Sequence, residues 1–154
     1  MARDLFVTQL RTAVWVEQAL ADEVLPDLID RVGDPELARR LERHLGETRE
    51  HLRVVRALLH ERAGSIEPLE SPALLGLLAE HERLPESDLA HCAAAAASEH
   101  LELALYESLA STAEALGEEA VGLALRELME QESFALEELS RSRAKLLAEA
   151  YARP

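Results

Sequence analysis

Glutamate and histidine side chains stand next to apolar residues in four stretches of the sequence, where carboxylates and imidazoles could bind a metal ion together. In the first stretch, Glu17 has apolar residues one turn before it and one turn after it on the same helical face. A buried carboxylate is unfavourable unless it is paired or bound to a metal. The alternative is that Glu17 lies at the edge of the apolar stripe and reaches solvent.

The other three stretches repeat this pattern. His44, Glu47 and His51 follow one another at spacings of three and four, so they share one side of a helix and can contact the same ion, or they border the core as partly exposed residues. Glu99 and Glu132 each lie beside the leucines of a later helix. The chain has 30 acidic residues, so some must fall beside an apolar face by chance. All four stretches, however, lie near the middle of a predicted helix, and in a helical bundle those midpoints meet.

The elements that would position these residues follow from the apolar periodicity. Apolar residues recur at helical spacing over four long ranges, which we predict to be helices: 4–31, 35–62, 87–116 and 118–150. Pro26 predicts a kink in the first of them. Asp34 and Pro35 predict an N-cap and a first helical residue, so the second helix must turn back beside the first.

The connection between the second and third helices is long. Residues 64–86 include three of the six prolines, and within them Ser71 and Pro72 predict the start of a short helix over 73–79. A connection of this length can cross from one end of a bundle to the other. The pattern of short, long and short connections is that of ferritin-like bundles. We therefore predict an all-α fold: a ferritin-like antiparallel four-helix bundle with a long crossover, in a single domain over residues 1–154.

The composition indicates which partners and which cellular compartment to expect. The formal charge of −14 would repel nucleic acid and anionic lipid, so we expect neither as a partner. No apolar run approaches the roughly 20 residues of a membrane span, and Cys92 is the single cysteine. We expect a cytoplasmic protein in a reducing compartment.

The sequence resembles the YciF-like branch of the ferritin-like superfamily over most of its length. The resemblance is carried by Asp4-Leu-Phe, by a glutamate on the first helix ahead of Leu25-Pro26, and by three later segments: 44–51, 98–106 and 130–132. The third of these, Ser-Glu-His-Leu-Glu-Leu-Ala-Leu-Tyr over 98–106, is the most specific.

The resemblance implies a di-iron-type carboxylate site with iron or manganese as cofactor. Carried over residue by residue, it implies that the metal ligands are Glu17, Glu47, His51, Glu99 and Glu132. Glu102, Glu130 or His44 could replace one of them. It further implies divalent metal ions as partners, a homo-oligomer and a role connected with stress. It assigns no reaction, so the protein is either an enzyme or a binding protein.

Two interpretations remain open from the sequence. The first is a ferritin-like metal-binding protein whose site is complete or incomplete. The second is a non-enzymatic helical bundle that acts as an oligomerisation or docking module and keeps only a degenerate metal site.

Overall fold

The computed structural model describes residues 1–152, and within this range every regular element is helical, which confirms the all-α class. The ends of the four long helical stretches agree with the predicted ranges to within two residues. In chain order the elements are α1 (Ala2–Ala19), η1 (Leu20–Val24), α2 (Leu25–Arg31), α3 (Pro35–Ala63), α4 (Pro72–His81), α5 (Asp88–Ala115) and α6 (Glu119–Ala152).

The first helical stretch contains a π-helical turn, η1, directly before α2 and Pro26, at the place where the sequence predicted a kink. Pro26 lies in the first turn of α2, directly after η1. In a first helical turn the missing N–H of proline removes no required hydrogen bond. The π turn and the helix that follows it therefore accommodate the proline within one helical stretch.

Capping residues fix the starts of α3, α4 and α5. The Asp34 carboxylate accepts hydrogen bonds from the backbone N–H groups of Glu36 and Leu37, which confirms the predicted N-cap. Ser71 and Ser87 cap α4 and α5 in the same way. At the other end of α3, Gly64 has φ +66°, a left-handed conformation that favours glycine and ends the helix.

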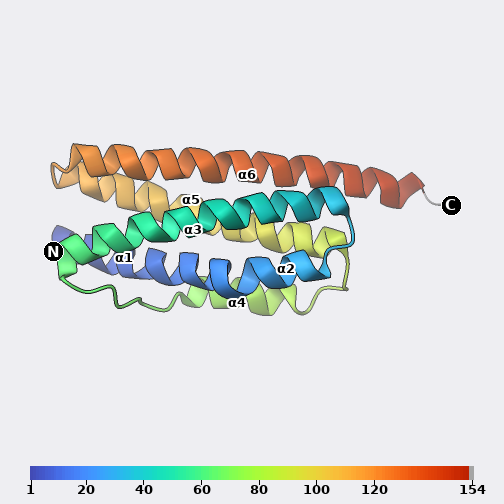
Figure 1. The fold of residues 1–154 in the computed structure, drawn as a ribbon, viewed down its shortest axis with the longest axis horizontal. Helices are drawn as coiled ribbons and strands as arrows, with labels where there is room; N and C mark the ends of the chain where they lie inside the picture. Colours follow the sequence, from blue (N-terminus) through green and yellow to red (C-terminus); the bar gives the residue numbers. More distant parts are fainter. Residues whose placement is uncertain (153–154) are drawn as a thin grey trace.

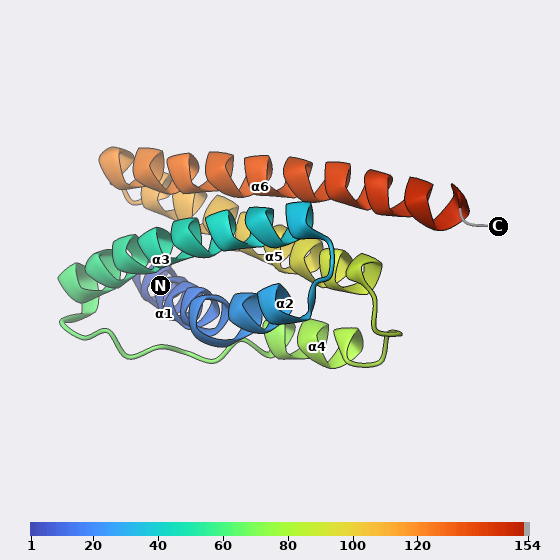
Figure 2. The same ribbon diagram turned by 45° about the vertical axis from the view of Figure 1, so that its right-hand side comes forward.

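Four long helical segments lie side by side in the structure (Figures 1 and 2). The segment formed by α1, η1 and α2 runs antiparallel to α3, and α5 runs antiparallel to α6. Residues 64–87, including α4, pass along the outside of the molecule, so α3 and α5 point in the same direction. Among residues 1–152, no helix has the length and apolar character needed to cross a membrane.

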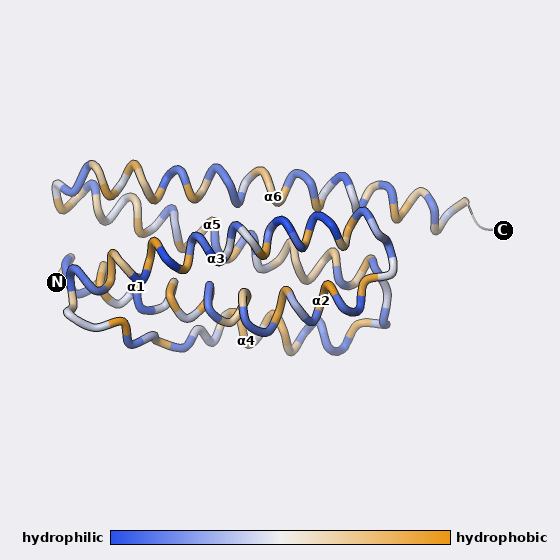
Figure 3. The backbone as a smooth tube through the Cα atoms, in the orientation of Figure 1, coloured by the Kyte–Doolittle hydropathy of each residue, from blue (hydrophilic) through white to orange (hydrophobic). Residues whose placement is uncertain are grey.

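The apolar core is divided into two clusters along the long axis. Figure 3 shows hydrophobic residues recurring along every long helix. The first cluster is formed by buried residues near one end of these helices, among them Phe6, Leu59, Leu109 and Leu125. The second is formed near the other end, among others by Leu25, Leu37, Cys92 and Leu146.

Each long helix contributes to both clusters, and buried glutamate or histidine residues lie where the two contributions meet. On α1, for example, Val14 belongs to the first cluster and Val16 to the second, and Glu17 lies next to them. On α6, Glu132 lies between Leu128 of the first cluster and Leu139 of the second. The fold thus places one polar layer between two apolar clusters.

Candidate metal centre

The polar layer gathers four of the five residues that the sequence suggested as ligands. Glu17 of α1, His51 of α3, Glu99 of α5 and Glu132 of α6 are each at most 1% exposed. The apolar clusters on both sides separate these side chains from water. Buried ionisable groups of this kind need a partner such as an opposite charge or a metal ion.

Glu17, His51 and Glu132 form the first group of possible ligands. Each offers one ligand atom, and these atoms lie within 4.8 Å of one another. His51 Nδ1 lies 2.6 Å from Glu132 Oε1 and 3.9 Å from Glu17 Oε1. The group combines one imidazole nitrogen with two carboxylates.

A second group consists of His44, Glu99, Glu102 and Glu132, again with ligand atoms within 4.8 Å of one another. His44 Nε2 lies 2.6 Å from Glu99 Oε1, and His44 Nδ1 lies 4.0 Å from Glu132 Oε2. Glu132 belongs to both groups and directs a different oxygen toward each. Its carboxylate therefore lies between the two groups.

Two members of the second group were named by the sequence only as alternatives. Glu102 follows Glu99 by three residues and precedes the buried Tyr106 by four, so all three share one face of α5. His44, Thr48 and His51 follow the same rule on α3, and all three are buried. This regular spacing is the signal that could have identified His44 and Glu102. Glu130, the third alternative, is exposed on α6.

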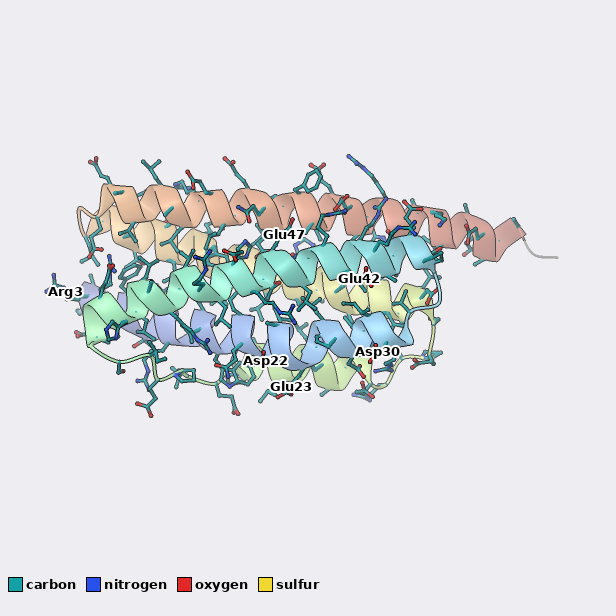
Figure 4. The ribbon with its side chains drawn as sticks, viewed as in Figure 1. Arg3, Asp22, Glu23, Asp30, Glu42 and Glu47 are labelled. Atoms are coloured by element: carbon teal, nitrogen blue, oxygen red, sulfur yellow. The ribbon has the colours of Figure 1, made fainter. Side chains whose placement is uncertain are left out.

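The structure places Glu47 at the edge of this layer, outside both groups. Its side chain is 30% exposed, and its Oε2 lies 3.5 Å from His44 Nδ1. Figure 4 labels it on α3, beside α6. Thr48, the next residue on α3, lies on the buried face of the helix. Neighbouring residues of a helix point in different directions around its axis, so Glu47 points toward the edge of the layer.

Many polar atoms of the two groups have no hydrogen-bond partner. Among residues 1–152, no partner is found for either oxygen of Glu99, Glu102 and Glu132, for one oxygen of Glu17 or for the Nδ1 atoms of both histidines, all of them buried. The short contacts between histidines and glutamates thus lack hydrogen-bond geometry, although their distances are small. Unpaired buried polar atoms are rare in folded proteins and call for a reason such as a bound ion. Lone pairs that converge without donors match the ligand set of a cation.

Three polar side chains hold the groups in position. The Tyr106 hydroxyl donates a hydrogen bond to Glu17 Oε1, and the Tyr106 ring packs edge-on against His51. Gln131 Oε1 lies 2.8 Å from His51 Nε2, which leaves His51 Nδ1 to face the glutamates. Thr48 Oγ1 lies 3.4 Å from His44 Nε2. Contacts of this kind orient ligating side chains in metal sites.

The electrostatics of the layer favour protons on several carboxyls when no cation is present. Burial, reinforced by the charge of Glu132, raises the pKa of Glu17 to about 8. Burial likewise raises the pKa of Glu99 to about 8 and that of Glu102 well above its usual range. For His51, contact with Glu132 outweighs burial and raises the pKa to about 9. When no cation is bound, protons thus neutralise part of the negative charge of the carboxylates.

Comparison with known proteins places this chain in a family. The family model described as "Domain of unknown function (DUF892)" matches residues 1–152. No curated protein sequence matches the chain at a significant level.

Solved structures of three proteins share the fold. YcfI from Rhodopseudomonas palustris, a proposed structural protein, is 27% identical with a TM-score of 0.84, over 91% of this chain and 93% of that one. The E. coli stress protein YciF is 25% identical with a TM-score of 0.87, over 96% and 98%. A protein from Xanthomonas campestris pv. campestris is 27% identical with a TM-score of 0.83, over 99% and 98%. The chain therefore belongs to the DUF892 family, and its structural relatives are YciF-like proteins of the ferritin-like fold.

Proposed function

We propose that this chain is a ferritin-like four-helix bundle, with its long crossover over residues 64–86, that binds divalent metal ions in the polar layer between its helices. The observation that carries the proposal is the convergence of buried carboxylate and imidazole atoms without hydrogen-bond partners. The similarity to the E. coli stress protein YciF supports a role connected with stress.

The residues present fit a pair of metal positions. Glu17 and His51 would hold an ion at one position, His44, Glu99 and Glu102 would hold one at the other, and Glu132 would contribute to both. Ligand sets rich in carboxylate oxygens with a single imidazole suit iron or manganese. Iron at both positions would supply redox chemistry toward oxygen or peroxide.

The protein's own groups would prepare the layer for cations. Tyr106 fixes one oxygen of Glu17 and leaves the other free. Gln131 fixes the orientation of His51. The two apolar clusters exclude water from both sides, which strengthens the attraction between a cation and the carboxylates. A cation must also displace the protons that raised pKa values keep on Glu17 and Glu99, so binding releases protons.

One observation favours the alternative, a bundle that associates with itself or with another protein. Leu123 and Phe134 are 64% and 52% exposed, and their spacing of eleven residues puts both on the outer face of α6. Exposed apolar residues of this size occur at association surfaces. Oligomerisation is compatible with metal binding. The alternative differs from the proposal only in assuming that the polar layer no longer binds metal.

Calorimetric titration of the metal-free protein with Fe(II), Mn(II) and Zn(II) separates the two. We expect binding by the unmodified protein and its loss in Glu132→Gln, because Glu132 belongs to both groups. The matched control is Glu42→Gln, an exposed carboxylate on α3 that should leave binding unchanged (Figure 4). At a metal concentration of about 100 times Kd, binding should stabilise the fold by about 2.7 kcal/mol.

Binding that Glu132→Gln retains would contradict the proposed site. A protein that binds none of the three metals, with an unchanged melting temperature in their presence, would support the degenerate layer instead.

A further inference from the structure

A narrow pocket of about 10 Å³ lies between α3 and α6, beside the candidate metal centre. Its lining includes Arg40, His44 and Glu47 from α3 and Ala135 and Glu138 from α6. His44 belongs to the second group of possible ligands, so the inner wall of the pocket is part of the centre itself. Larger surface grooves, such as the one lined by Met129 and Phe134, contain no residue of either group.

The inner end of the pocket presents an unsatisfied buried atom. His44 is 5% exposed, and its Nδ1 has no hydrogen-bond partner. The opposite ring nitrogen, Nε2, lies 2.6 Å from Glu99 Oε1. His44 Nδ1 thus lies between two other carboxylates, 3.5 Å from Glu47 Oε2 and 4.0 Å from Glu132 Oε2, while Nε2 faces Glu99.

The outer end presents a carboxylate with no basic partner. Glu47 is 30% exposed and lies 3.5 Å from His44 Nδ1. Within residues 1–152, no lysine or arginine lies within ion-pair distance of it, whereas Glu138 in the same pocket is paired with Arg43. Of these two acids, Glu47 is therefore the one free to receive a cation from solvent.

His51 is more deeply buried than His44, at 0% exposed. The exposed residue Gln131 places its Oε1 2.8 Å from His51 Nε2. His51 Nδ1 faces inward, toward Glu132 and Glu17. A cation that entered beside His51 would have to displace the Gln131 side chain. In the pocket beside Glu47, the Arg40 guanidinium donates hydrogen bonds to the Glu138 carbonyl and to Glu36, which leaves the Glu47 carboxylate itself without a lysine or arginine partner among residues 1–152.

We propose that this pocket is the access route for divalent cations, and that Glu47 and His44 Nδ1 form a transfer position through which an ion passes to the inner carboxylates. This inference rests on the proposed metal-binding function. The excess of acidic residues, with a formal charge of −14, attracts cations to the surface in general. A cation attracted to Glu47 lies next to His44, which belongs to the candidate metal centre.

Stopped-flow mixing of the metal-free, full-length protein with Co(II) tests the route, with the visible absorption of bound Co(II) as the signal. Glu47→Gln keeps the size of the side chain and removes its charge. We expect association to slow by about tenfold, in the range found for electrostatic steering. Since the same route serves entry and exit, dissociation should slow equally and the equilibrium Kd should stay nearly constant.

Glu42→Gln is the matched control, because it removes one acidic charge from the exposed side of the same helix (Figure 4). It should leave both rates unchanged. Faster dissociation in Glu47→Gln with unchanged association would make Glu47 an equilibrium ligand and overturn the inference. Unchanged rates would mean that ions enter elsewhere and would overturn it as well. Failure of the unmodified protein to bind Co(II) would overturn the proposed function itself, and this inference with it.

Discussion

Tyr106 and Glu17 illustrate how single residues make a buried charged layer tolerable. Tyr106 is 1% exposed, and its hydroxyl gives Glu17 the one hydrogen bond that this carboxylate has. An unpaired buried polar group destabilises a fold by more than a hydrogen bond stabilises it. Tyr106 is therefore both a core residue and the main support of Glu17.

Replacing Tyr106 by phenylalanine keeps the ring and removes the donor. We expect Tyr106→Phe to lower the free energy of unfolding of the metal-free protein by about 1 to 3 kcal/mol, measured by urea denaturation. The matched control is Tyr151→Phe, since Tyr151 is 87% exposed and should have no measurable effect. Equal stability of the two variants would show that the hydroxyl of Tyr106 contributes nothing to the fold.

The raised pKa values predict how stability depends on pH. The pKa values of Glu17 and Glu99 rise from 4.5 to about 8, and that of His51 rises from 6.5 to about 9. Over these intervals the folded protein holds protons that the unfolded chain has released, so stability falls as pH rises. The lowered pKa of Glu132 acts in the opposite direction, but only below its ordinary value of 4.5.

With a chelator present, we expect the urea midpoint to decrease between about pH 6 and about pH 9. In Glu17→Gln, residue 17 cannot titrate, so the urea midpoint of this variant should decrease less steeply with pH. A midpoint that is constant or increases over this interval would contradict the protonation of the layer.

At the scale of the helices, local sequence signals predicted the helix ends. Asp34 and Ser71 were predicted as helix starts because they precede a proline and apolar-periodic residues, and Ser87, where the third predicted helix begins, is the N-cap of α5. The π turn at Leu20–Val24 could not be predicted in this way. A π turn adds one residue to a helical turn, and the pattern of apolar and polar residues around it does not reveal that extra residue. Pro26 was visible in the sequence, but its effect depends on how α1 packs.

The N-cap of α3 gives a test at this scale. The Asp34 carboxylate caps the helix and also forms an ion pair with Lys145, whose Nζ lies 2.8 Å from Asp34 Oδ2. Asp34→Ala removes both and should lower the free energy of unfolding by about 1 kcal/mol. Asp34→Asn keeps a capping oxygen but loses the charge, and should lose less. If Asn and Ala were equally destabilising, the ion pair rather than the cap would be the main contribution.

For the candidate centre, helical spacing predicted which helices contribute but not which rotation each one has. Glu47 and Thr48 are neighbours on α3, yet Thr48 is buried and Glu47 lies at the rim. A rotation of the helix by one residue decides between them, and that rotation depends on packing against the other helices. The same uncertainty explains why Glu102 was an alternative to Glu99, although both are buried.

At the scale of the whole molecule, the polar layer lies between two apolar clusters that all four long helices share. Each cluster fixes the helices on one side of the layer, so the carboxylates stay together despite their repulsion. The fold therefore stabilises an arrangement that its charged residues alone would disfavour. This arrangement supports the proposal that the layer binds cations.

Anomalous diffraction from a crystal soaked in Mn(II) or Fe(II) tests this account most directly, because it locates the ion rather than its effects. The account predicts anomalous density inside the molecule, between Glu132 and the two groups that share it, with His44 and His51 adjacent. Density only at exposed carboxylates such as Glu42, with none in the polar layer, would contradict it.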